Sequence, residues 1–488
     1  MVKAVVGEET RLKFAEDRLS QSGLTSQVGL VIGKFSSALD RGFVFDLVPT
    51  PPNDASEPAC SLIGTTKEDN RKGAKSKSQS VDSSSLVVDK DWVAEHARQV
   101  SRMLVGGMKV IGIYVWISDT AFKNSTIMLC QTVKGVAEAA PISETDWDER
   151  LLIQICYSPR RWTCRNCSLS SNITSSSLRP CDFKMGRVLA SVRTFKCMHN
   201  FNLRLPIHHE SANQKFVDIL RHGISVHWKD LKGANAMIDG NLVINDEPCS
   251  TDGLHEVELL LPFMKNTFVE ACSQKDVVGV LVFSGSVCSF ACLNAKEPVS
   301  QAVADIKDDI IRSLQSRLGI ICDEAEGDQP PADDASRESI KEQSPGKPVS
   351  QLSLISLRKT CSLPFPRRVF VPWLENTFIC DYLQPSETLE VLKDRCLELM
   401  SMEAPNDAST ILEPEGAALS LRAKSFWDVA IPFASSLDLS VQKDNVNATA
   451  TFSESSAKAE KSTNINVIAA VFFLFLSLLV GFLLLRRS

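Results

Sequence analysis

Cysteines and histidines between residues 164 and 209 come nearest, in type and spacing, to a chemical site. Cys164 and Cys167 form a C-x2-C pair, and Cys181 and Cys197 follow. A structural zinc site needs four soft ligands, and one C-x2-C pair supplies two of them. The later cysteines stand singly, not as a second pair. The pattern favours reduced thiols and leaves zinc binding at Cys164 and Cys167 undecided.

Three other groups resemble parts of reactive sites, and each has a simpler structural interpretation. The spacing of Cys288 and Cys292 puts both sulfurs on one face of a strand, as in a buried core. Residues 208–210, His-His-Glu, fall in a predicted turn, and His96 falls on an amphipathic helix. No G-x-S-x-G, P-loop or G-x-G-x-x-G motif occurs in strand-helix context. We therefore expect a protein that is not an enzyme and has no cofactor or metal.

Two arginine pairs lie beside aromatic residues, at 160–162 and 366–370. Each pair is suited to bind an anion or a protein partner. Solvated charges above packed aromatic rings are the commoner arrangement for such pairs. We therefore expect both pairs, Arg160 with Arg161 and Arg367 with Arg368, to lie in solvent.

Alternating strand and helix patterns fill residues 1–160, which we predict to be a layered α/β (α+β) domain. Strands are indicated at 28–34, 43–48, 109–117 and 151–157, and helices at 89–107 and 122–140. The first helix begins at an aspartate and ends at a glycine, as capped helices do. The continuous apolar run at 109–117 is typical of a strand covered on both faces.

A second α/β region is predicted at 161–326, and a small β/α block at 351–401. Strand patterns occur at 188–205, 256–262 and 277–285, followed by a helix at 300–318. Val303, Ile306, Ile310 and Leu314 form one apolar stripe on that helix. A buried strand before a long helix resembles the first domain, which suggests a structural duplication.

Polar, low-complexity stretches separate these regions. Residues 65–85 are rich in Lys and Ser and read as a disordered insertion, since they lack the apolar groups that offset chain ordering. Residues 327–350 form a predicted disordered linker. Residues 402–464 are interpreted as a flexible tether.

An apolar run near the C-terminus predicts a single transmembrane helix at 465–485. A helix of this length is roughly 28 Å long at about 1.5 Å per residue, which matches the hydrocarbon thickness of a bilayer. A span so close to the chain end must insert after synthesis, and no signal peptide pattern precedes it. We expect the anchor to comprise Val467, Phe472, Phe473, Phe475, Leu485, Arg486 and Arg487.

Composition supports a protein facing the cytosol. The net charge of −6 argues against a nucleic-acid partner. The 15 cysteines are then expected to be reduced thiols, because the cytosol does not sustain disulfides. We therefore expect the bulk of the chain to be cytosolic.

Several segments resemble the odorant response abnormal 4 homologue family: 29–34, 92–104, 112–115, 367–372 and 380–383. The resemblance spans most of the chain. It implies a cytosol-facing protein with a C-terminal span that assists folding, trafficking or localisation of multispanning, G-protein-coupled-type receptors at the endoplasmic reticulum. It also implies partnership with the protease of a ubiquitin-fold modifier.

The first domain also resembles the MPN fold of ubiquitin-type metalloproteases. Active members hold Zn²⁺ through two histidines and an aspartate, with one position open for water. The stretch at 112–118 matches the end of their buried strand and places Val115 and Ile117 at the histidine positions. Leu129 falls near the aspartate position. The resemblance therefore implies a domain that has lost its metal.

The leading hypothesis is a membrane-anchored adaptor with no catalytic activity and no small-molecule substrate. A rival hypothesis is a membrane-bound, metal-dependent hydrolase of modifier conjugates, with zinc ligands among Cys164, Cys167, His199 and His208. A third is a structural membrane protein without stable partners.

Overall fold

The computed structural model describes residues 2–63, 84–142, 149–169, 177–208, 216–244, 246–262, 277–327, 362–375, 377–405 and 407–425. All of them belong to one compact unit, residues 1–432. Nearly all of the predicted insertion and linker lies outside these residues. So do the predicted transmembrane helix and its anchor residues. None of the described helices combines the length and apolar composition that crossing a membrane requires.

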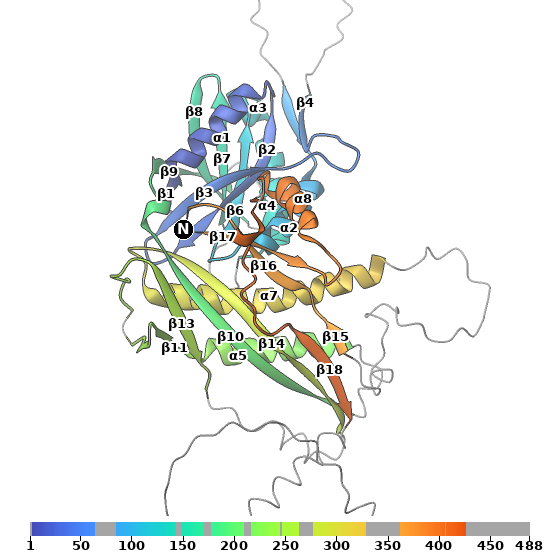
Figure 1. Cartoon of the computed structure of the whole chain (residues 1–488). Helices are drawn as coiled ribbons and strands as arrows, with labels where there is room; N and C mark the ends of the chain where they lie inside the picture. The colour runs from blue at the N-terminus through green and yellow to red at the C-terminus, as the bar shows by residue number, and fades with distance from the viewer. Residues whose placement is uncertain are drawn as a thin grey trace, which may run out of the picture. The chain divides into compact units, whose positions relative to one another are not determined.

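A closed β-barrel forms the N-terminal part of this unit (Figure 1). Its strands follow in the order β1 (Ala4–Glu8), β3 (Arg41–Pro49), β2 (Gln27–Ser36), β6 (Lys109–Trp116), β7 (Glu149–Tyr157), β8 (Arg160–Ser168) and β9 (Leu178–Gly186). Parallel pairing of β1 with β9 closes it. The domain boundary predicted at residue 160 is wrong, because β8 pairs with β7 along its whole length and β9 extends the barrel to Gly186.

Helices cover the barrel on two sides. Helix α1 (Glu9–Gln21) packs on one apolar cluster, and α2 (Lys90–Met103) and α4 (Thr126–Ala139) pack on another. The Asp89 side chain accepts a hydrogen bond from the Trp92 amide, which confirms the predicted helix start. The helix predicted at 122–140 is broken at Ser125 into α3 (Asp119–Asn124) and α4. A short antiparallel strand pair, β4 (Cys60–Ile63) with β5 (Ser85–Val88), borders these helices.

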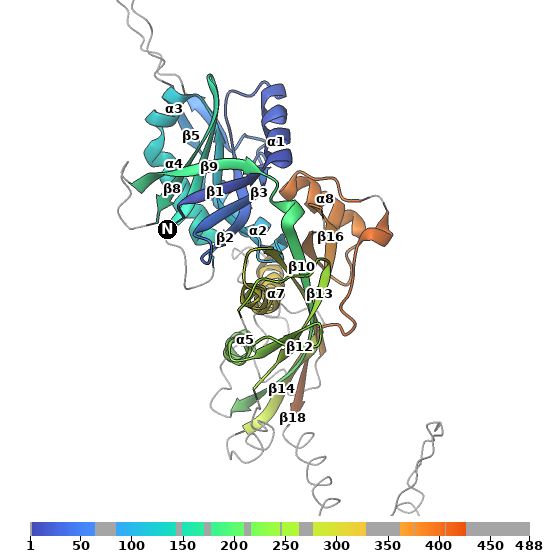
Figure 2. The same cartoon turned by 90° about the vertical axis from the view of Figure 1, so that its left-hand side faces the viewer.

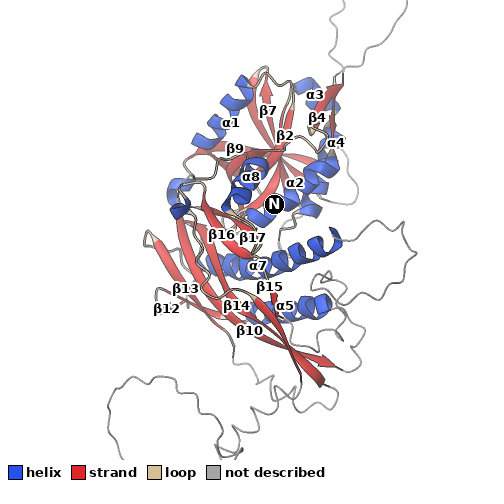
Figure 3. Ribbon diagram, turned by 45° about the vertical axis from the view of Figure 1, so that its right-hand side comes forward, coloured by secondary structure: helices blue, strands red, loops and turns tan. Residues whose placement is uncertain are grey.

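The second sheet is open, in the order β12 (Asn241–Leu242), β11 (Asn235–Ile238), β13 (Leu254–Leu260), β10 (Val192–His208), β14 (Val277–Asn294), β18 (Ser420–Ser425) and β15 (Ser362–Pro364). Helices α5 (Phe216–Lys232) and α7 (Val299–Gly327) lie along one face of it, as Figures 2 and 3 show. The predicted stripe on α7 is confirmed, since all four residues are buried there.

A C-terminal block completes the unit: the hairpin β16 (Arg367–Pro372) and β17 (Phe378–Leu383), then α8 (Leu389–Met400). The tether predicted from residue 402 begins too early, because β18 pairs with β14. Leu419 and Leu421 are buried in the core of the second sheet. The apolar contacts of these two leucines hold the segment around β18 in the folded unit, although its mostly polar composition indicated a flexible tether.

The turn after α2 joins the barrel to the second sheet. Gly106 and Gly107 have φ values of 72° and 78°, a backbone region that favours glycine. The Gly106 carbonyl accepts a hydrogen bond of 2.8 Å from the Cys292 amide on β14. A Cβ atom on Gly107 would lie 2.3 Å from an Asp305 carboxylate oxygen on α7. The two glycines therefore allow the barrel to approach both elements closely.

Candidate functional site

The positions matched to metal ligands lie in the hydrophobic core. Val115 and Ile117, on and just after β6, are fully buried, and so is Leu129 on α4. All three belong to the cluster beneath α2 and α4. Hydrocarbon side chains cannot coordinate zinc, so this part of the barrel serves packing.

The C-x2-C pair is divided between the two faces of the barrel sheet. Cys164 pairs across strands with Cys181 in the cluster under α1. Cys167 belongs to the opposite cluster, where the thiol of Cys130 on α4 contacts it. Residues three apart on a strand point to opposite faces, so these two sulfurs cannot share one ion. The zinc site weighed for this pair is therefore wrong.

His199 lies elsewhere, on β10 of the second sheet. Its Nε2 is 3.1 Å from Nε2 of His227 on α5, and burial lowers the pKa of each ring to about 4. The side chain of His208, the remaining proposed ligand, lies outside the described side chains. Within the described ranges, no three His, Cys, Asp or Glu side chains are arranged to hold a metal ion. Of the rival ligand set, the three members whose side chains the structure describes, Cys164, Cys167 and His199, are therefore not brought together.

A cleft of about 480 Å³ opens between the barrel and helices α5 and α7. The barrel contributes the ends of β2 and β6, and the helices contribute the last turn of α5 and the first turns of α7. Its charged lining residues are Lys34, Lys109, Lys232, Lys307, Asp305 and Asp308. The lysines come from four distant parts of the sequence, which is why no local pattern indicated this site.

Two of these lysines lie at the barrel wall of the cleft. Lys34 Nζ is 2.6 Å from Asp305 Oδ2 and 3.8 Å from Glu297, and both side chains are buried with it. Burial favours its neutral form, yet these two carboxylates raise the pKa of Lys34. Lys109 is compensated less well: its nearest carboxylate, on Asp308, is 3.8 Å away, and burial and Arg312 lower its pKa. Lys109 would therefore be stabilised by another anion.

The helical wall adds two more cations and an aromatic surface. Lys307 Nζ donates to the Ala234 carbonyl at 2.6 Å, and burial lowers its pKa. Lys232 Nζ lies 4.8 Å from the centre of the Trp228 ring. Neither lysine makes an ion pair among the described residues. The cleft therefore offers positive charge beside an apolar wall, which suits a negatively charged ligand with an apolar part.

A second polar cluster lies beneath the C-terminal block and is fully buried. Arg368 donates two hydrogen bonds of 2.9 Å to the carboxylate of Asp309 on α7 and one of 3.0 Å to the Cys288 carbonyl. The expectation that Arg368 lies in solvent is wrong, because β16 pairs with β17 and turns this side chain inward to the acid. Arg367, the next residue, is exposed as expected.

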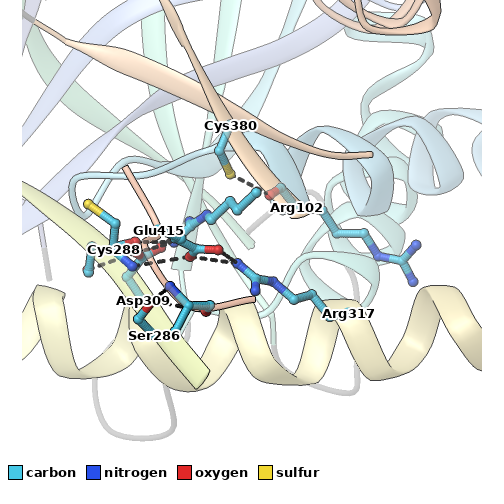
Figure 4. Close-up of polar contacts among 10 residues, drawn as sticks. Arg102, Ser286, Cys288, Asp309, Arg317, Cys380 and Glu415 are labelled. Atoms are coloured by element: carbon cyan, nitrogen blue, oxygen red, sulfur yellow. Dashed lines mark hydrogen bonds and ion pairs between the residues drawn. The ribbon is translucent and has the colours of Figure 1, made fainter. Parts of the chain in front are cut away.

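Glu415 extends this cluster, as Figure 4 shows. Arg317 Nη2 is 2.7 Å from both carboxylate oxygens of Glu415, and Glu415 also accepts a hydrogen bond of 3.1 Å from the Cys288 amide. The Cys380 thiol donates to the Arg102 carbonyl at 3.4 Å. These contacts join α2, α7, β14 and the C-terminal segments into one unit. Both guanidinium groups of the cluster, those of Arg317 and Arg368, are paired with a buried carboxylate, so we assign the cluster a structural role.

The remaining sequence candidates are structural. His96 is buried, and its ring nitrogens contact the Thr50 hydroxyl at 3.3 Å and the Leu399 carbonyl at 2.8 Å. Cys288 and Cys292 are buried, as predicted. Both outcomes agree with packing roles.

Fold and cleft together define a mixed α/β protein with a barrel, an open sheet and a cationic cleft between them. The family model described as odorant response abnormal 4-like matches residues 29–411. The chain therefore belongs to the odorant response abnormal 4-like family, as the sequence resemblance implied.

Proteins named odr-4 homolog are similar along most of their length. The one from Mus musculus is 25% identical over 446 residues, covering 86% of this chain and 87% of its own. The one from Homo sapiens is 24% identical over 430 residues, covering 82% and 83%. The one from Dictyostelium discoideum is 24% identical over 405 residues, covering 81% and 79%.

Among solved structures, a UfSP from C. elegans aligns with 82% of this chain and 57% of its own at 8% identity. Its TM-score is 0.36. A likeness this distant assigns neither fold nor function.

Proposed function

We propose that this protein is a membrane-anchored adaptor without catalytic activity, which acts at the endoplasmic reticulum with its folded unit in the cytosol. Its cargo would be multispanning receptors of the G-protein-coupled type, whose folding, trafficking or localisation it assists. It would also anchor the protease of a ubiquitin-fold modifier. Family membership supports the receptor role, and the apolar run at 467–485 supports the anchor.

The observation that carries the adaptor proposal is the cationic cleft. Its walls belong to the barrel and to α5 and α7, which are held together by buried contacts such as that of Lys34 with Asp305. A rigid cleft of this kind binds a ligand without having to order itself first. Lys232 and Lys307, together with Trp228, fit an acidic peptide segment that carries an apolar side chain.

The test is recovery of partners with full-length protein purified from its own cells in mild detergent. Replacing Lys232 by glutamate reverses one cleft charge and should reduce partner recovery at least several-fold. The matched control is Lys229→Glu, which changes an exposed lysine on the same helix that does not line the cleft. Equal recovery with both variants would show that the cleft does not bind the partner.

The anchor is tested separately. Removal of residues 465–488 should release the protein from membranes while partner recovery persists, since the cleft lies wholly within residues 1–432. Retention on washed membranes after this deletion would contradict the proposed anchor. Loss of partners from the released protein would contradict a cytosolic docking site.

A further inference from the structure

The edge of the second sheet carries three side chains that the adaptor role does not use: Cys249, His255 and Asp239. The Cys249 sulfur lies 3.5 Å from Nε2 of His255. On the other side of the same ring, Nδ1 lies 2.7 Å from Oδ2 of Asp239. A thiol, an imidazole and a carboxylate in this order constitute a nucleophile, a base and a group that orients the base.

Asp239 is fixed in place by a tight turn. It occupies the two-residue loop between β11 and β12, where Asp239 and Gly240 have φ values of 50° and 79°. Such Asp-Gly loops close hairpins in a single conformation. The second carboxylate oxygen accepts the Glu256 amide at 2.9 Å. Its hydrogen bond to His255 lowers the pKa of the Asp239 carboxyl, so the group is ionised at neutral pH.

His255 is held by its position on β13. Its side chain is only 5% exposed, and its ring packs 4.9 Å from that of Phe195. Because the ionised Asp239 accepts a hydrogen bond from Nδ1–H, that proton stays on Nδ1 and Nε2 faces the Cys249 thiol as the acceptor. The Thr251 carbonyl lies 3.3 Å from the same Nε2. Once Nε2 has gained a proton, the Thr251 carbonyl can accept a hydrogen bond from it. The charged ring would then donate to both Asp239 and Thr251, which stabilises it.

Cys249 lies on a loop that is tied down at both ends. The Glu247 carbonyl accepts the Val299 amide at 3.1 Å at the start of α7. Asp252 accepts from the Arg193 guanidinium on β10 at 3.1 Å. The Cys249 side chain is partly exposed, whereas most of the other cysteines in the described residues are buried. The thiol is therefore both positioned and within reach of a small molecule.

We propose that Cys249, His255 and Asp239 form an acyl-accepting thiol site, whose substrates are small activated esters and acyl thioesters. The Cys249 sulfur forms a bond to the acyl carbon as its proton passes to Nε2 of His255. The bond from the acyl carbon to the leaving oxygen or sulfur then breaks. The leaving group departs with that electron pair and takes the proton from Nε2. The products are an acyl-Cys249 thioester and a free alcohol or thiol, and no oxidant or reductant is needed.

The test uses the full-length protein in mild detergent with p-nitrophenyl acetate as the probe. Mass spectrometry of peptides should locate one acetyl group on Cys249, formed together with one equivalent of p-nitrophenolate. Replacing Cys249 by serine should abolish the release of this one equivalent of p-nitrophenolate. The matched control is Cys181→Ser, which removes another partly exposed cysteine and should leave acetylation of Cys249 unchanged.

The role of the base is tested with His255→Gln. Acetylation of Cys249 at pH 7 should slow on the order of 10²-fold, the range expected when a general base is lost. The difference should shrink at pH 9 to 10, where hydroxide replaces the imidazole as the base. A purely structural histidine would not produce this change in the pH profile.

Asp239→Asn removes the carboxylate and should preserve the fold, because asparagine also tolerates the left-handed backbone of the turn. It should slow acetylation less than His255→Gln and leave thermal unfolding nearly unchanged. Acetylation of Cys249 no faster than that of Cys181 in the unmodified protein would overturn the proposal. So would rates that are equal in the His255 variant and the unmodified protein across the pH range.

Discussion

Replacing Arg368 by methionine should destabilise the protein far more than the same change at its neighbour Arg367. Arg368 and Asp309 have side chains only 1% and 2% exposed and share two hydrogen bonds of 2.9 Å. Without the guanidinium, the Asp309 carboxylate keeps the hydrogen bond of 2.8 Å that it accepts from the Ser289 hydroxyl. A buried carboxylate would then lack a counter-charge.

The size of the effect follows from burial. Removing one member of a buried, hydrogen-bonded ion pair costs about 3–5 kcal/mol of unfolding free energy, because the other charge stays buried. Arg367 pairs with Glu413 at 3.5 Å, and both side chains are nearly half exposed. A pair of that kind is worth about 0–1 kcal/mol. The two adjacent arginines should therefore differ by roughly 2–5 kcal/mol.

Urea unfolding of full-length protein in mild detergent, followed by tryptophan fluorescence, measures this difference. The double change Arg368→Met with Asp309→Leu provides an internal check, because it removes both buried charges. It should recover much of the stability lost in Arg368→Met alone. Equal midpoints for the Arg367 and Arg368 variants would refute the reasoning, and a double variant no more stable than the single one would weaken it.

Four further predictions concern other parts of the unit. Burial lowers the pKa of His199 and His227 to about 4, so the unfolded chain binds more protons between that pH and about 6.5. Stability should therefore fall as the pH drops through this window, by on the order of 2 kcal/mol per histidine between pH 7 and pH 5. The fall should be less steep in His227→Gln, and urea midpoints at pH 7 and pH 5 measure it. Gly112→Ala should disrupt the barrel, since a Cβ there would lie 2.0 Å from the Leu151 carbonyl oxygen. Gly135→Ala on α4 should instead raise the melting temperature, because alanine is more favourable than glycine inside a helix by about 1 kcal/mol. Lys34→Met should cost about 3–5 kcal/mol in urea unfolding by leaving the carboxylates it contacts buried without a cation; an unchanged midpoint would contradict this.

Local patterns predicted the elements whose own residues carry the signal. The strand pair at 28–48, the helix starting after Asp89 and the stripe of α7 all have apolar side chains at the period of the element. Helices α1 and α5 were not predicted from the sequence. Helix α1 has only three buried residues among charged ones, so its apolar signal is weak. Strand β18 is apolar at few positions, and its pairing with β14 decides its structure.

The cleft and the thiol site were beyond prediction for a different reason. Lys34 and Asp305 lie 271 positions apart in the chain, and only the tertiary fold brings them together. One signal was present in the sequence: a lysine at position 34 within an otherwise apolar strand implies a buried partner. Cys249 and His255 are close in sequence, but their geometry depends on the turn that places Asp239. Side-chain chemistry without spatial placement does not identify such sites.

The pairing of β18 with β14 has a consequence for how this chain is made. Strand β14 exposes an unpaired edge until residues 420–425 have left the ribosome and paired with it. His96, on the helix α2 that covers the barrel, contacts the Leu399 carbonyl. This part of the structure is therefore also completed only after residues near 399 have been synthesised. Contacts this far apart in sequence form slowly, and exposed strand edges favour aggregation in the interval. The nascent chain must therefore be protected until β18 has been made, and a chain cut short before β18 should aggregate.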